Sequence, residues 1–162
     1  MSSLTVGKYA TADGAAQSLE TLFRARDEGL IKVYDGMLVT WQPGRKRPMT
    51  RPILETRTLE SLDPAFWGIL MGLLFFVPPE AANVDPSSQA LHGILTHVGI
   101  DADFINQARH GITEGTSAVF LYSEAMDLDA VARLAAHTGV EMIATTMPPE
   151  RAAHLREIFG SQ

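Results

Sequence analysis

Residues 117–146 read SAVFLYSEAMDLDAVARLAAHTGVEMIATT, and this pattern predicts a strand, a helix and a second strand. Ser117–Tyr122 is a continuous, mostly apolar run after a Glu-Gly turn, as in a strand buried on both faces. Asp127 stands where an N-cap belongs, and Gly139 can end the helix in the left-handed conformation. Val140–Thr146, which is rich in β-branched residues, predicts the second strand. The helix between them has its apolar residues on one face: Leu128, Val131, Leu134 and Ala135.

Residues 4–41 repeat this order. Leu4–Tyr9 predicts a first strand, and an amphipathic helix follows from Asp13 until Gly29. Ile31–Trp41 then has apolar residues at alternate positions, interrupted at Asp35-Gly36, where a bulge would fit. Two such strand-helix-strand units side by side predict a ferredoxin-like split βαβ sandwich of the α+β class. Its antiparallel sheet would carry two helices on one face.

A basic segment follows the first unit. Gln42–Arg45 is a turn signal, and the return segment to Leu54 contains Pro48 and Pro52, so it is expected to be an edge strand. The chain has a net charge of −6, which argues against nucleic acid as a partner. The cations of this segment can meet an anion, a lipid headgroup or an acidic patch on a second copy, or simply form a solvated turn. The candidate contacts are Arg45, Lys46, Arg47 and Arg51.

The segment between the two units, residues 55–112, contains an apolar run at Ala65–Val77. Its thirteen residues carry no charge and begin after Asp63-Pro64, a helix start signal. A helix of this length spans about 20 Å, whereas a bilayer core is about 30 Å thick. We expect this helix to be buried on every side, in its own core, against other copies or in one leaflet. Gly68 and Gly72 form a G-x-x-x-G pair that allows close helix packing.

Further helices are predicted on both sides of the second unit. Pro86–Val98 has one apolar face, and a short helix begins at Asp101. Pro148-Pro149 open a last amphipathic helix. We therefore expect a single domain over residues 1–162 that contains a helical insertion at 55–112. The inward-facing residues of the short helix are expected to be Phe104, Ile105 and Ala108.

Signs of catalysis or metal binding are weak. Cys is 0, which excludes thiolate chemistry and cysteine metal sites, and no nucleophile-elbow or phosphate-loop motif occurs. His92 and His97 are five apart and do not share a helix face, although symmetry mates at an oligomer axis could meet there beside Asp101 and Asp103. We expect no enzymatic activity, no cofactor and no metal. Residues 1–8 contain no signal peptide pattern, so the cytoplasm is the expected location.

Several strings together resemble a known family. They are Gly29-Leu-Ile, the run from Ala65 to Pro78, Val98-Gly-Ile-Asp-Ala-Asp-Phe-Ile and Gly115-Thr-Ser-Ala-Val-Phe-Leu. They resemble the bacterial domain of unknown function 1269, over roughly residues 13–158. The family is described as predicted membrane proteins and is loosely associated with stress proteins. The resemblance implies a ferredoxin-like domain with an inserted apolar hairpin and no established catalytic residues. Here the second hairpin arm, Pro86–Val98, is polar-faced, which favours a soluble oligomer.

Three functions remain open from the sequence. The first is a non-enzymatic oligomeric scaffold or stress-related structural protein. The second is a peripheral membrane protein that inserts Ala65–Val77 into one leaflet, helped by the basic segment. The third is a carrier whose aromatic residues line an apolar ligand cavity, although such residues are more often core. The candidate oligomerisation residues are Phe66, Trp67, Gly68, Leu70, Met71, Gly72, Leu74 and Phe75.

Overall fold

A five-stranded sheet lies at the centre of the chain, in the order β3-β2-β4-β1-β5, with every neighbouring pair antiparallel. The computed structural model describes residues 2–54, 64–76, 100, 102–126 and 128–146. The predicted strand at Ser117–Tyr122 is the central one, which explains its unbroken apolar run. The strands are β1 (Ser2–Tyr9), β2 (Ile31–Thr40), β3 (Met49–Pro52), β4 (Ser117–Ala125) and β5 (Glu141–Thr146).

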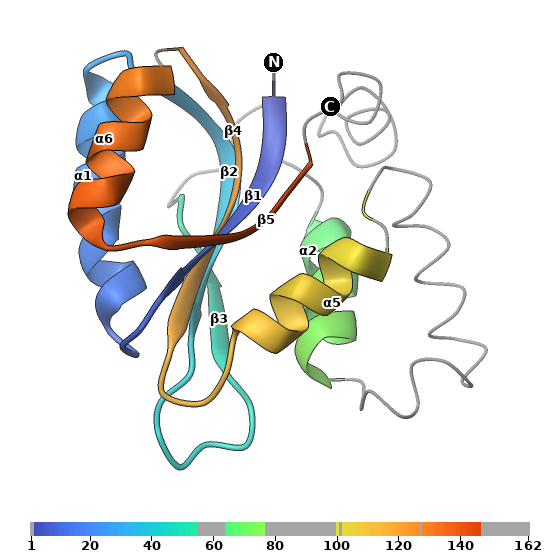
Figure 1. Cartoon of the computed structure of the whole chain (residues 1–162). Helices are drawn as coiled ribbons and strands as arrows, with labels where there is room; N and C mark the ends of the chain where they lie inside the picture. The colour runs from blue at the N-terminus through green and yellow to red at the C-terminus, as the bar shows by residue number, and fades with distance from the viewer. Residues whose placement is uncertain (1, 55–63, 77–99, 101, 127, 147–162) are drawn as a thin grey trace.

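Helices cover both faces of this sheet (Figure 1). Helices α1 (Gly14–Asp27) and α6 (Leu128–Thr138) lie on one face. Helix α2 (Pro64–Met71), its π-helical continuation η1 (Gly72–Phe76) and helix α5 (Ala102–Gly111) lie on the other. The expected α+β class with an antiparallel sheet is confirmed. The predicted helices at residues 86–98 and 148–159 lie outside the described residues.

The predicted helix ends are also confirmed. Helix α1 begins directly after Asp13, although the Asp13 side chain makes no capping hydrogen bond. Gly29 and Gly139 follow α1 and α6 with φ angles of 77° and 79°. These angles lie in the left-handed region, which glycine adopts without a Cβ penalty, so each glycine stops its helix.

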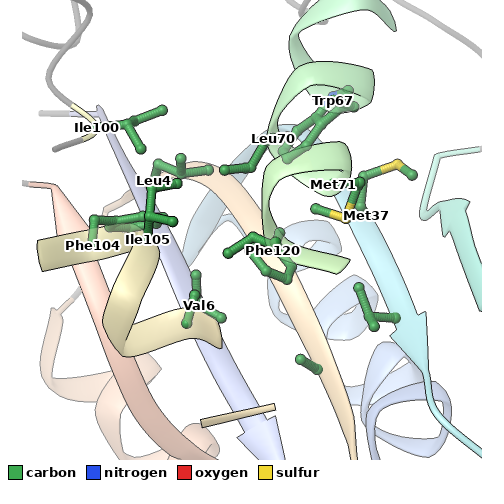
Figure 2. Close-up of a cluster of buried hydrophobic side chains, with 14 of the residues drawn as sticks. Leu4, Val6, Met37, Trp67, Leu70, Met71, Ile100, Phe104, Ile105 and Phe120 are labelled. Atoms are coloured by element: carbon green, nitrogen blue, oxygen red, sulfur yellow. The ribbon is translucent and has the colours of Figure 1, made fainter. Parts of the chain in front are cut away.

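Alternating side chains of β4 divide the interior into two cores. Val119 belongs to the smaller core under α1, together with Ala15 and Leu19. Phe120 and Tyr122 belong to the larger core under α2 and α5. Figure 2 shows this larger core, in which side chains of α2 and α5 meet those of β1, β2 and β4. The residues it labels are Leu4, Val6, Met37, Trp67, Leu70, Met71, Ile100, Phe104, Ile105 and Phe120.

The interruption at Asp35-Gly36 is a β-bulge, as predicted. Val33 pairs with Ser123 and Asp35 with Tyr122, so Tyr34 is one residue more than the partner strand supplies. A bulge turns two successive side chains toward the same face of a sheet. Tyr34 accordingly belongs to the larger core, and Asp35 also reaches α2 on that face. The bulge thus places polar groups on the face that α2 covers.

Candidate functional site

The apolar helix of the insertion is the first candidate site. It begins at Pro64 as predicted, but its last five described residues are π-helical. Its large side chains pack inside the chain, against the sheet, and Phe66 and Leu70 are fully buried. Of the predicted oligomerisation residues, Phe75 is partly buried in the same core. The buried ones are Phe66, Trp67, Leu70, Met71 and Leu74.

The opposite side of α2 carries small residues. Ala65 and Gly68 are exposed and Gly72 is half-buried, so the described residues of the chain do not cover α2 on every side, and its burial against other copies stays a prediction. These three positions are spaced by three and four residues and therefore share one helix face. No described atom lies within 4 Å of a Cβ built at Gly68 or Gly72. We call Ala65, Gly68 and Gly72 the small-residue face.

A buried hydrogen bond holds α2 to the bulge of β2. Trp67 Nε1 donates to Asp35 Oδ2 at 2.9 Å, and the backbone N–H of Gly36 donates to Asp35 Oδ1 at 2.9 Å. The Asp35 side chain is only 7% exposed. Because a buried carboxylate needs hydrogen-bond donors to offset its lost hydration, this contact demands one rotation of α2, the one that presents the indole N–H.

Two tyrosines and a glutamate lie beside this contact. The Tyr34 hydroxyl donates to Glu124 Oε2 at 2.9 Å, and the Tyr34 and Tyr122 rings are 5.3 Å apart in a tilted arrangement. Together with Asp35 they make one end of the larger core polar, whereas the rest of it is apolar. Within the described residues, the sheet thus offers α2 a carboxylate acceptor beside Trp67.

A second polar contact lies at the other end of the apolar helix. Arg109 of α5 donates from its guanidinium to the backbone carbonyl of Leu73 in η1. Burial lowers the pKa of the Arg109 guanidinium, which is still protonated at neutral pH because its ordinary pKa is so high. A cation is favourable beside free carbonyls at a helix C-terminus. Arg109 thus joins the two helices that cover this face.

The predicted anion contacts lie together in the basic hairpin, which we define as residues 41–54. Arg45, Lys46, Arg47 and Arg51 are all exposed. Trp41 connects this hairpin to the apolar helix, because its ring packs edge-on against Phe75 at 6.1 Å between ring centroids. The two groups of predicted site residues are therefore neighbours in the fold.

Two further kinds of site are a group of metal ligands and a membrane-spanning helix. Among the residues that the structure describes, no group of three or more His, Asp or Glu side chains could hold a metal ion. His92, His97 and Asp101 lie outside those residues, and Asp103 is exposed on α5. Within the same described ranges, no helix has the length and apolar character needed to cross a bilayer.

Sequence reasoning missed Asp35, Trp67 and Arg109 as polar contacts. The break in alternation at Asp35-Gly36 was a signal for the bulge, and its polar residue could have suggested a buried acceptor. Arg109 left no comparable signal, because its partner is a backbone carbonyl that any residue could supply at position 73.

Comparison with known proteins identifies a family. The family model described as Protein of unknown function (DUF1269) matches residues 61–160, which include α2, α5 and the second strand-helix-strand unit. No curated protein and no solved structure matches the chain. The resemblance noted from the sequence strings is therefore confirmed at the level of the family. Because the match covers more than half of the 162 residues, the chain belongs to the DUF1269 family.

Proposed function

We propose that the protein is a non-enzymatic, cytoplasmic homo-oligomer that acts as a scaffold or stress-related structural protein and assembles through the small-residue face of α2. The proposed contact includes fewer residues than the whole apolar helix, since the large side chains of α2 are already packed in the core of the chain. Of the small-residue face, Ala65 and Gly68 are exposed and Gly72 is half-buried.

The observation that carries this proposal is a contrast between glycines. A Cβ at Gly7 would lie 2.5 Å from Val140 Cγ2, and one at Gly36 would lie 2.7 Å from the Phe120 carbonyl oxygen. At those positions the chain itself requires glycine. At Gly68 and Gly72 no described atom makes such a demand, although each glycine in a helix costs about 1 kcal/mol relative to alanine. Close packing of a second helix would explain why glycine stands at these two positions.

We also infer a ferredoxin-like arrangement for the two strand-helix-strand units. The strand order β2-β4-β1-β5, with α1 and α6 on one face, supports this topology. In this interpretation β3 is an added edge strand, and the described elements of the predicted insertion at residues 55–112, α2, η1 and α5, cover the second face. The exposure of Ala65 and Gly68 on α2 supports the small-residue face as the contact with a second copy.

Leaflet insertion of Ala65–Val77 fits the described contacts less well. Phe66, Leu70 and Leu73 would have to leave a core in which each is fully buried. Removing such side chains from a packed core costs about 1.5–3 kcal/mol each, which membrane insertion would have to repay before giving any net affinity. Assembly through the small-residue face leaves the core intact.

Light scattering coupled to size-exclusion chromatography, without detergent, tests the assembly. The wild-type protein should have a mass that is a multiple of 17.6 kDa. Gly68→Leu or Gly72→Leu should lower that mass, because each adds a bulky side chain to the contact while leaving the described core untouched. Ala16→Leu is the matched control, since Ala16 is a small exposed residue on α1. It should leave the mass unchanged.

Two results would overturn the proposal. One is a wild-type monomer at every concentration measured. The other is a Gly68→Leu protein that is folded by circular dichroism and keeps the wild-type mass. If Ala16→Leu lowers the mass instead, the contact lies on α1 and the proposed face is wrong.

A further inference from the structure

The basic hairpin concentrates positive charge on an acidic protein. Residues 41–54 contain four cations and no Asp or Glu, whereas the whole chain has a net charge of −6. All four cationic side chains are exposed, and the turn that carries three of them is the lowest part of the view in Figure 1. Over distances beyond about 8–10 Å salt screens the acidic remainder, so a partner at this hairpin meets mainly positive charge.

The backbone of the hairpin is well fixed. Arg45 N–H donates to the Gln42 carbonyl at 3.2 Å, and Trp41 Nε1 donates to the Arg45 carbonyl at 2.9 Å. Gly115 N–H donates to the Trp41 carbonyl at 2.8 Å from the neighbouring turn. None of these three bonds uses a cationic side chain, and the exposed Arg and Lys groups are carried by a prearranged turn. Prearrangement lowers the entropy cost of binding.

One apolar side chain stands among these cations. Met49 is 66% exposed in β3, between Arg47 and Arg51 in the sequence. Strand β3 is an edge of the sheet, but Pro48 and Pro52 lack the backbone N–H that strand addition by a protein partner would use. Binding here must therefore rely on side chains. Several cations around an exposed, flexible apolar side chain match a surface with negative headgroups above an apolar layer.

We propose that the basic hairpin docks on the anionic lipid surface of a membrane, with Met49 entering the headgroup region while α2 stays packed on its sheet. This differs from leaflet insertion of the apolar helix, since no buried side chain has to leave the core. It can be tested separately from self-assembly, because the hairpin and the small-residue face have no residue in common.

Co-sedimentation with vesicles tests the docking. The wild-type protein should bind vesicles of equal parts phosphatidylcholine and phosphatidylserine, and it should not bind phosphatidylcholine alone. Raising NaCl from about 0.1 M to about 1 M shortens the Debye length from about 10 Å to about 3 Å and should release the protein. A combined Arg45→Glu, Lys46→Glu and Arg47→Glu variant should bind at least about 100-fold more weakly.

A matched variant distinguishes the effect of the hairpin cations on binding from the effect of the net charge of the protein. Arg24→Glu, Arg26→Glu and Lys32→Glu change the net charge equally, and all three side chains are exposed outside the hairpin. This control should bind within a few-fold of wild type. Met49→Ala should weaken binding several-fold without changing its salt dependence, since it removes apolar contact only. Light scattering on each variant ensures that equal oligomers are compared.

Four outcomes would overturn the proposal. They are no binding to the anionic vesicles at low salt, equal losses in the two triple variants, binding to phosphatidylcholine alone, and anionic binding that survives the hairpin reversals. The last two would indicate insertion of an apolar segment. An acidic polypeptide that binds the hairpin while the anionic vesicles do not would assign the surface to a protein partner instead.

Discussion

The helices on the two faces of the sheet differ in what fixes their rotation. Helix α1 buries Ala15 and Leu19 and exposes Glu20 and Arg24, so only one rotation about its axis places the apolar side inward. Residues 65–76 have no charged side chain, so α2 differs from side to side only in the size of its apolar residues. Hydrophobic burial turns the small-residue face away from the sheet but sets the rotation less sharply than a charged face would.

On the second face of the sheet, polar contacts fix the rotation of α2. Trp67 donates a hydrogen bond to the Asp35 carboxylate, and Arg109 donates one to the Leu73 carbonyl. A hydrogen bond to a buried group is directional, and leaving that group unsatisfied costs about 1–3 kcal/mol, so wrong rotations are penalised. An amphipathic helix carries its orientation in its own pattern, whereas an apolar helix depends on a few residues in other elements.

The largest expected effect tests whether α2 is core. Phe66→Ala should lower the free energy of unfolding by about 3–5 kcal/mol, because the ring is completely buried and its removal leaves a cavity. Phe23→Ala on α1 should cost about 1 kcal/mol, since Phe23 is partly buried and Arg26 covers its ring at the surface. Urea unfolding followed by circular dichroism measures both. Similar small losses would contradict the packing of α2 on the sheet.

The next effect tests the polar selection at the bulge. Asp35→Ala should cost about 2–4 kcal/mol, because the Trp67 and Gly36 N–H groups both lose an acceptor. A double-mutant cycle with Trp67→Phe should give a coupling of about 1–2 kcal/mol. Asp13→Ala is the control on the other face. It should change stability by less than about 0.5 kcal/mol, since the Asp13 carboxylate makes no capping hydrogen bond. A coupling near zero would show that the hydrogen bond does not orient α2.

The smallest effect concerns the second polar contact. Arg109→Met keeps most of the apolar stem but removes the donor to Leu73, and we expect a loss of about 1 kcal/mol. Arg24→Met removes an exposed ion pair with Glu20, whose side chain is 82% exposed, and should cost less than about 0.5 kcal/mol. Both values come from the same urea titrations. A more stable Arg109→Met protein would mean that desolvation of the guanidinium outweighs its hydrogen bond.

Much of the fold was predictable because it depends on local chemistry. Alternating apolar residues indicated β2, an unbroken apolar run β4 and β-branched residues β5, while a period of 3.6 indicated the helices. Pro48 and Pro52 indicated the edge position of β3. Gly29 was foreseen at a helix end, since a left-handed residue is needed there. The family was recognisable from short strings, and the match over residues 61–160 confirms it.

The arrangement of the candidate site was less predictable. Because this helix has no polar side, Phe66 and Gly68 were both predicted to lie in an interface. The sheet separates them, burying the ring and leaving the glycine exposed. Ala65 and Gly68 present little apolar area, so their exposure within one chain costs little, and their burial against a second copy stays a prediction.

The bulge in β2 lets this strand contain one residue more than β4 without changing the pairing on either side. Val33 and Asp35 pair with successive residues of β4, as they would in a regular strand that lacked Tyr34. The residues on either side of Tyr34 therefore keep the faces that they would have in that shorter strand. The additional residue therefore places the Tyr34 ring beside Asp35 on the face that α2 covers, without turning any other side chain of β2 to the opposite face. The Tyr34–Glu124 hydrogen bond is thus an addition to the sheet that leaves the remaining pairs of β2 and β4 in register.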